Sequence, residues 1–112
     1  MGKKTILVDL DGVLNEYTGT YEKNNIPKPK KDVEKFLKNL NKDYEVVVFT
    51  TRNLLETSRW LIRNKLDKFI NDVSNIKKAA YLCIDDRAIQ FEGDFSDTLE
   101  KIKNFAPHWK NK

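Results

Sequence analysis

The sequence is poor in the residues that build disulfides and zinc sites. Its 112 residues contain one cysteine, Cys83, and one histidine, His108. An internal disulfide is therefore impossible, and a lone cysteine with a lone histidine cannot form a structural zinc cluster. No histidine lies near Cys83 in sequence, so thiol catalysis has little support. We expect Cys83 to be a core residue of an apolar strand.

Long apolar runs and a strong charge bias are also absent. No run approaches the roughly 20 residues of a membrane span. The first residues lack the apolar region and cleavage site of a secretory signal. We therefore expect a cytoplasmic protein with no membrane partner, either a monomer or a small homo-oligomer. Lysine and arginine number 21 against 17 acidic residues, a mild excess that is compatible with anionic partners without establishing them.

Short apolar runs rich in branched residues are present and are typical of strands buried in a parallel sheet. They span residues 4–10, 44–49 and 80–84. A weaker segment lies at residues 69–73, and residues 89–91 are predicted to form an edge strand. Strands that alternate with helices favour parallel pairing through right-handed crossovers. We expect a single three-layer, Rossmann-like α/β domain with a mostly parallel sheet of about five strands, in the order 3-2-1-4-5.

Three amphipathic segments predict helices. The first covers about residues 30–41, the second follows Asn53, which resembles a capping box with Glu56, and the third is capped by Asp94. Apolar positions at helical spacing predict the faces that pack inward. In chain order these faces comprise Val33, Phe36, Leu37 and Leu40, then Leu55, Ser58, Ile62 and Leu66, then Phe95, Leu99 and Ile102. Residues 106–112 are expected to fray.

Acidic side chains follow two of the predicted strands. Asp9 and Asp11 come at the end of the first, and Gly12 lets the chain turn so that both carboxyl groups converge. Asp85 and Asp86 end the third apolar run. Open parallel sheets bind ligands at the carboxyl ends of their strands, so we expect four carboxylates around one point. A hard divalent cation, best matched by magnesium, would neutralise them.

Four carboxylates and one divalent cation would leave a net negative charge at this edge, which would repel a phosphate ligand. A nearby lysine would reduce that charge. Lys77 precedes the third apolar run, with Lys78 as its immediate alternative. Thr50 supplies a hydroxyl at the end of the second run, with Thr51 as its substitute. Backbone N–H groups at strand-to-helix turns, such as that of Gly12, attract phosphate further.

Four segments in this order resemble the haloacid dehalogenase superfamily of phosphohydrolases: DLDGV, VVVFTTR, a lysine and YLCIDDR. The resemblance covers about residues 5–87 and implies a magnesium-dependent phosphatase. It makes Asp9 the nucleophile that forms an aspartyl-phosphate. It makes Asp11 the general acid and base, whose backbone carbonyl also binds magnesium. By the same resemblance Thr50 holds a phosphoryl oxygen, and Lys77 bridges the nucleophile and the phosphate.

The resemblance also makes Asp85 and Asp86 the acidic pair of the metal site, without deciding which one touches the ion directly. Members of the family often carry a cap domain over the site. Here 38 residues separate Asp11 from Thr50, and 26 separate Thr50 from Lys77. Helices and strands already occupy both gaps. The chain therefore looks like a capless member, whose open site suits bulky or macromolecular phosphoesters or needs a partner subunit to exclude water.

The sequence leaves the substrate open among nucleotides, sugar phosphates and other phosphomonoesters. The TTR and IDDR strings also resemble the phosphatase domain of phage polynucleotide kinase-phosphatase. That resemblance implies a 3′-phosphorylated nucleic-acid end as an alternative substrate and Arg52 as a phosphate contact, although Arg52 equally fits a plain helix start. A third hypothesis is a receiver-like phosphate-binding module without turnover. In receiver domains, however, the acidic pair comes first and the lysine last.

A few polar and aromatic residues stand outside these motifs. Tyr17 and Tyr21 are expected to stabilise their loop by aromatic packing, with the mouth of the site as the alternative. His108 and Trp109 are assigned to packing or disorder. Asn15 could touch substrate, but nothing in the sequence selects it.

Overall fold

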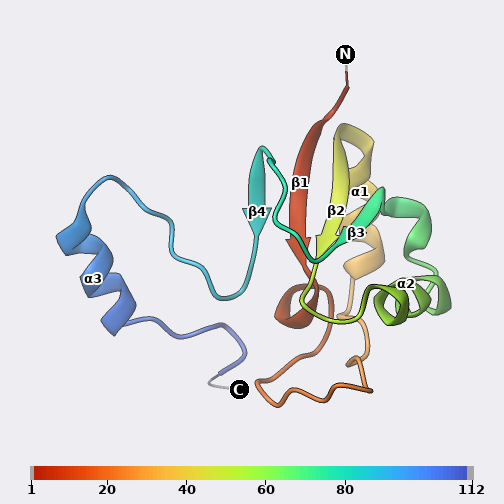
Figure 1. The fold of residues 1–112 in the computed structure, drawn as a ribbon, viewed down its shortest axis with the longest axis horizontal. Coiled ribbons are helices and arrows are strands. Elements are labelled where there is room, and N and C mark those ends of the chain that lie inside the picture. The colour runs from red at the N-terminus through yellow and green to blue at the C-terminus, as the bar shows by residue number, and fades with distance from the viewer. Residues whose placement is uncertain (1, 111–112) are drawn as a thin grey trace.

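The computed structural model describes residues 2–110 and shows an α/β fold around a parallel sheet. The sheet has four strands in the order β3-β2-β1-β4 (Figure 1). The strands are β1 (Lys4–Asp9), β2 (Tyr44–Phe49), β3 (Asp72–Ser74) and β4 (Leu82–Ile84). All three strand pairs are parallel. The predicted Rossmann-like class and parallel pairing are confirmed, and so is the order of the first four strands.

The predicted fifth strand is wrong for the part of the chain that the structure describes. Residues 89–91 lie in an extended segment that leads away from β4 without pairing to it. Because β4 itself has only three residues, it offers few free backbone groups along which another strand could pair. The sheet therefore ends at β4.

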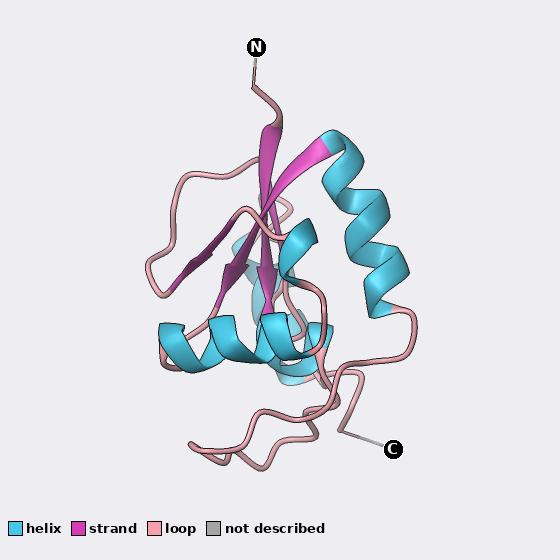
Figure 2. Ribbon diagram, turned by 90° about the vertical axis from the view of Figure 1, so that its right-hand side faces the viewer, coloured by secondary structure: helices cyan, strands magenta, loops and turns pink. Residues whose placement is uncertain are grey.

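One face of the sheet is covered by helices α1 (Val33–Asp43) and α2 (Leu54–Arg63). Figure 2 shows α1 running alongside the strands. Alternate residues of β1 and β2 meet side chains of both helices in one buried cluster. Its members include Ile6, Val8, Val46, Val48, Leu37, Trp60 and Leu61. This cluster is the core of the fold and holds β1, which carries Asp9, in the centre of the sheet.

The predicted inner face of α1 is largely confirmed. Val33 and Leu37 are buried, and Leu40 packs against the core from its margin. Phe36 lies at the edge of that face and is 39% exposed. The helix begins a few residues later than predicted, at Val33, and follows the segment that returns from the turn after β1.

The predicted inner face of α2 is wrong at two of its four residues. Leu55 and Ile62 are exposed, whereas Trp60 and Leu61 are buried. Ser58 is half-buried, and Leu66, which lies beyond the end of the helix, is buried as predicted. The indole of Trp60 removes far more apolar surface from water than a leucine does, so it sets the rotation of the helix. Its Nε1–H donates to the carbonyl of Pro27 at 3.1 Å, which satisfies its polar atom. The predicted cap is confirmed, because the Asn53 side chain accepts from the N–H of Glu56.

Helix α3 (Phe95–Lys103) does not form the predicted third layer. Asp94 caps it as predicted, but none of its residues is buried, and Phe95 is 78% exposed. Figure 1 shows α3 joined to β4 by an extended segment and lying away from the sheet. The second face of the sheet instead faces the connection between β3 and β4, and Cys83 on this face is exposed rather than part of the core.

Across the described residues, no helix combines the length and the apolar character that crossing a membrane requires.

Candidate active site

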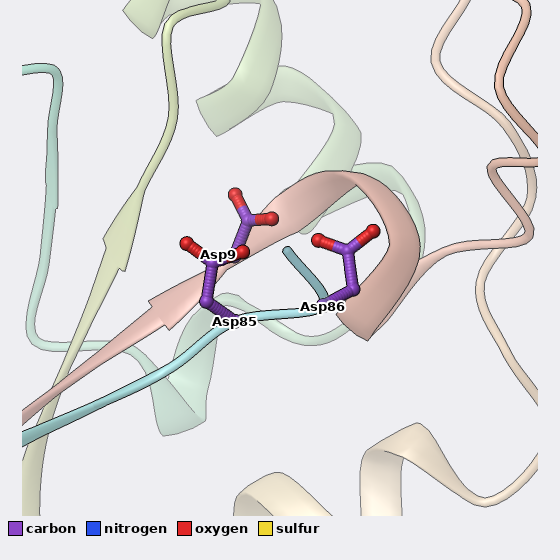
Figure 3. A group of neighbouring side chains, drawn as sticks. All are labelled: Asp9, Asp85 and Asp86. Atoms are coloured by element: carbon purple, nitrogen blue, oxygen red, sulfur yellow. The ribbon is translucent and has the colours of Figure 1, made fainter. Parts of the chain in front are cut away.

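Three carboxylates converge at the carboxyl edge of the sheet. β1 ends at Asp9, and Asp85 and Asp86 follow β4 directly. The parallel register pairs Val8 with Ile84, so both strands end at the same level. One oxygen from each of the three carboxylates lies within 4.8 Å of the others (Figure 3). The structure thus brings together three of the acidic residues that the sequence analysis selected.

Crowding changes the protonation of these groups. Burial, a hydrogen bond shared with Asp86, and the negative charges of Asp85 and Asp86 raise the pKa of Asp9 from 3.8 to about 8. At Asp86, burial opposes the charged form, but hydrogen bonds from Trp109 and Asp9 outweigh it and lower the pKa. At neutral pH, Asp9 therefore retains a proton that a cation could replace.

The donor set fits a hard divalent cation. All three residues offer carboxylate oxygens, the ligands that magnesium prefers, and the group contains no thiolate or imidazole that would favour zinc. Among the described residues, no ion pair neutralises Asp9, Asp85 or Asp86. No lysine or arginine of the described residues thus lies within ion-pair distance of the three carboxylates.

Asp11 lies outside this group, contrary to the expected convergence of four carboxylates. Its Oδ2 accepts from Arg52 Nε at 2.8 Å, and its Oδ1 accepts from Asn15 Nδ2 at 3.0 Å. Strand alternation fails here because β1 ends at Asp9, and Gly12 turns the chain with φ +86°. Asp11 thus leaves the cation group but still lines the same pocket as Asp9.

Arg52 is buried, which differs from its expected role as a phosphate contact. Besides its bond to Asp11, its Nη1 donates to the carbonyl of Glu22 at 2.9 Å. Its guanidinium lies over the ring of Tyr21, 4.6 Å from the centroid. Nη2 is buried and has no hydrogen-bond partner among the described residues. In this arrangement Arg52 orients Asp11 and ties the loop after β1 to the end of β2.

A pocket of about 250 Å³ opens beside the carboxylates. It is lined by residues from the ends of β1, β2 and β4 and from the loop after β1, namely Asp9, Asp11, Tyr17, Tyr21, Phe49, Thr50, Thr51, Asp85 and Arg87. The backbone N–H of Thr50 donates to the carbonyl of Ser74 at 2.9 Å, which fixes the end of β2. The hydroxyl oxygen of Thr50, Oγ1, accepts a hydrogen bond from the backbone N–H of Arg52. Thr51 is exposed at the mouth.

The structure separates the two candidate lysines. Lys77 shares a cavity of about 160 Å³ with Asp9 and Asp85 on the second face of the sheet. Lys78 instead points to β3, where its Nζ donates to Asp72 Oδ2 at 2.7 Å. Of the two lysines, Lys77 is therefore the one that lines a cavity with Asp9.

The turn after β1 has a residue that the sequence analysis did not select. Asn15 is fully buried, and its Oδ1 accepts from the N–H groups of Gly12 and Tyr17 at 3.2 and 3.1 Å. The amide of Gly12, expected to bind phosphate, is therefore already paired. Asparagine accepts readily from nearby backbone N–H groups, so its place just after the Asp-Gly turn was a usable signal.

The end of the chain also reaches the site, where fraying was expected. Pro107 is buried, and His108 Nε2 lies 2.6 Å from the carbonyl oxygen of Gly12. The Nε1–H of Trp109 donates to Asp86 Oδ2, and its ring meets Tyr17 edge to face at 5.3 Å. No local sequence signal identifies such contacts, because their partners lie from 23 to 96 residues apart in the chain. Residues 111 and 112, the rest of the predicted frayed tail, lie outside the described residues.

Comparisons with known proteins bear on the fold. No family model matches the chain, and no curated protein does. A conserved protein from Bacteroides thetaiotaomicron, of solved structure, is similar with a TM-score of 0.60 and 20% sequence identity over 92% of each chain. At this identity the likeness shows the fold alone. A shared fold does not by itself imply a shared function.

Proposed function

We propose that the protein is a magnesium-dependent phosphomonoesterase of the haloacid dehalogenase type, which forms an aspartyl-phosphate on Asp9. The observation that carries the proposal is the convergence of Asp9, Asp85 and Asp86, with no ion-pair partner among the described residues, beside an open pocket. The segment order that resembles this superfamily supports the same activity. Both arguments select Asp9 as the residue at the end of the central strand.

The chain's own residues have separate tasks in this proposal. Asp9, Asp85 and Asp86 would hold the cation, which screens the charges of the phosphate and the attacking carboxylate when bound. A carboxylate oxygen of Asp9 attacks phosphorus while the ester oxygen departs in line. Lys77 lowers the negative charge from the second face of the sheet, and the Thr50 hydroxyl donates to a phosphoryl oxygen.

Asp11 is the proposed proton donor to the leaving oxygen, and it later takes a proton from the water that hydrolyses the acyl-phosphate. Its two oxygens are tied to Arg52 and Asn15 in the structure. A turn of the Asp11 side chain toward the pocket is therefore part of the proposed cycle. Arg52 and Asn15 set the resting position from which that turn starts.

The proposed substrates are small phosphomonoesters of the cytoplasm, such as nucleotides or sugar phosphates. The pocket is lined by loops and strand ends, and neither gap in the chain contains a cap domain. An uncapped pocket leaves the leaving group in contact with solvent, so binding energy must come from the phosphate and its immediate neighbours. We therefore expect broad specificity toward the alcohol portion of the ester.

Hydrolysis of a chromogenic phosphate ester tests the proposal. With magnesium the protein should turn over, and Asp9→Asn should lose activity by roughly a thousand-fold or more because the amide is not a nucleophile. Asp72→Asn is the matched control, since Asp72 is an exposed carboxylate that pairs with Lys78 away from the pocket. Full turnover by Asp9→Asn contradicts the assignment. A lasting phosphoprotein without phosphate release points instead to a receiver-like module.

A phosphorylated polynucleotide end is the second candidate substrate. Exposed Tyr21, at 54%, and exposed Arg87 both line the open pocket. Aromatic and cationic side chains beside a phosphate site are typical of single-strand binding. On this hypothesis, rates on 3′-phosphorylated oligonucleotides exceed those on mononucleotides and fall steeply with salt. Equal rates without a salt slope favour the small-molecule substrate.

A further inference from the structure

The C-terminal strap, residues 107–110, lies against the turn that follows β1. Since a carbonyl oxygen only accepts hydrogen bonds, the His108 ring must donate its Nε2 proton to Gly12 at 2.6 Å. Buried Pro107 anchors the start of the strap. Together these contacts hold the next residue, Trp109, over the candidate active site.

The Trp109 side chain packs closely against two glycines, Gly12 and Gly19. A Cβ on Gly12 would lie 2.1 Å from Asp86 Oδ2 and 3.0 Å from Trp109 Nε1. A Cβ on Gly19 would lie 2.8 Å from Trp109 Cζ3. Both glycines have positive φ angles, which other residues adopt at a cost. The ring of Tyr17 also contacts the Trp109 ring edge to face.

The indole nitrogen of Trp109 can only donate a hydrogen bond, and it donates to Asp86 Oδ2. A carboxylate that accepts a fixed N–H bond loses rotamer freedom and stays oriented when a ligand arrives. Partners of this kind behind a ligating carboxylate are known to set metal affinity. Asp86 belongs to the cation group, and Trp109 contacts it from outside that group.

We propose that Trp109 is a positioning residue that orients Asp86 for magnesium, so that the C-terminal strap completes the cation site. The inference rests on the proposed function, because it requires that Asp9, Asp85 and Asp86 bind the ion.

Isothermal titration of the full chain with magnesium chloride tests this role without a substrate. Trp109→Phe keeps an aromatic ring and removes the N–H, and it should weaken magnesium binding by about 10-fold. Trp60→Phe is the matched control, because it removes an indole N–H bond to a carbonyl in the core and should leave magnesium affinity unchanged. Circular dichroism confirms that each variant is folded.

Indole resonances give a second measurement on the wild-type chain. Two indole N–H signals are expected, from Trp60 and Trp109, and Trp60→Phe assigns them. The Trp109 signal should shift with magnesium in step with the titration, while the Trp60 signal stays in place. If Trp109→Phe does not fold, the indole shift of the wild-type chain tests the proposal instead. A Trp109 signal that does not move with magnesium overturns the positioning role of Trp109.

The outcomes separate the two proposals. Magnesium binding of equal affinity in wild type and folded Trp109→Phe overturns the role of Trp109 and leaves the proposed function standing. A wild-type chain that binds no magnesium overturns both.

Discussion

The two parts of this chain differ in how they are held. In residues 4–74 the strands and two helices enclose one apolar core. Every buried apolar core side chain of the described residues lies before Asp67. In residues 75–110, large apolar side chains are mostly exposed, among them Ile76, Tyr81, Leu82, Phe91, Phe95, Leu99, Ile102 and Phe105. The first part therefore carries the stability, and the second depends on it.

The second part nevertheless supplies much of the candidate site. Lys77, Asp85, Asp86 and Trp109 all belong to it, and three paired residues of β4 join it to the sheet. One hydrogen bond, between His108 and the carbonyl of Gly12, joins the C-terminal strap to the first part. Segments with few buried apolar contacts open at low free energy. This site is therefore assembled from a stable half and a weakly held half.

The largest expected contrast is in stability. Leu37→Ala, in the core of α1, should lower the free energy of unfolding by about 3 kcal/mol, because it leaves a cavity among fully buried neighbours. Leu99→Ala, on exposed α3, should change it by less than about 0.5 kcal/mol. Urea denaturation measures both. Equal losses would break the comparison and show that α3 is packed in solution.

The next contrast is between the adjacent lysines. Lys77→Ala should lower phosphatase activity by about 100-fold, because it removes the cation that shares a cavity with Asp9. Lys78→Ala should lower it by less than about three-fold, since Lys78 pairs with Asp72 at β3. Initial rates at saturating magnesium measure the two effects. A larger loss at Lys78 would mean that the connection between β3 and β4 runs differently in the active protein.

A pH dependence of stability should also link the two halves. The pKa of Asp9 rises from 3.8 to about 8 on folding, so the native state binds a proton more tightly than the unfolded chain. The stability from this group is present below about pH 4 and is lost as pH rises through about 8. In a chelator, the melting temperature should therefore fall as the pH rises over this range.

Asp9→Asn should flatten this slope, and magnesium should reduce it. Thermal melts in parallel buffers measure both effects. A melting temperature of the metal-free wild type that is constant between pH 4 and 8 would contradict the crowding of the three carboxylates.

Local patterns predicted much of the frame. The apolar run at residues 44–49 forms β2 with the same bounds. Asn53 and Asp94 cap their helices as the sequence predicts. Asp9 and the acidic pair after β4 were identified by their place at strand ends. These features depend on residues next to each other in the chain, which is why a sequence reveals them.

Contacts between distant residues were not predictable in the same way. The rotation of α2 was decided by how Trp60 fits the core, and the position of Asp11 by Arg52, 41 residues away. The spacing of α3 predicted an inward face, but the three-residue β4 leaves little surface for it to cover. In each case the outcome depends on residues that are distant in the sequence.

Four strands, most of the helices and the acidic residues at the strand ends can be predicted from the sequence, because hydrophobic period and turn chemistry act over a few residues. Three further features depend on the folded chain: three carboxylates rather than four share one point, Lys77 rather than Lys78 lines a cavity with Asp9, and Trp109 donates to Asp86. These outcomes follow from the path of the chain after each strand, and that path is set by packing and close approach across the whole molecule.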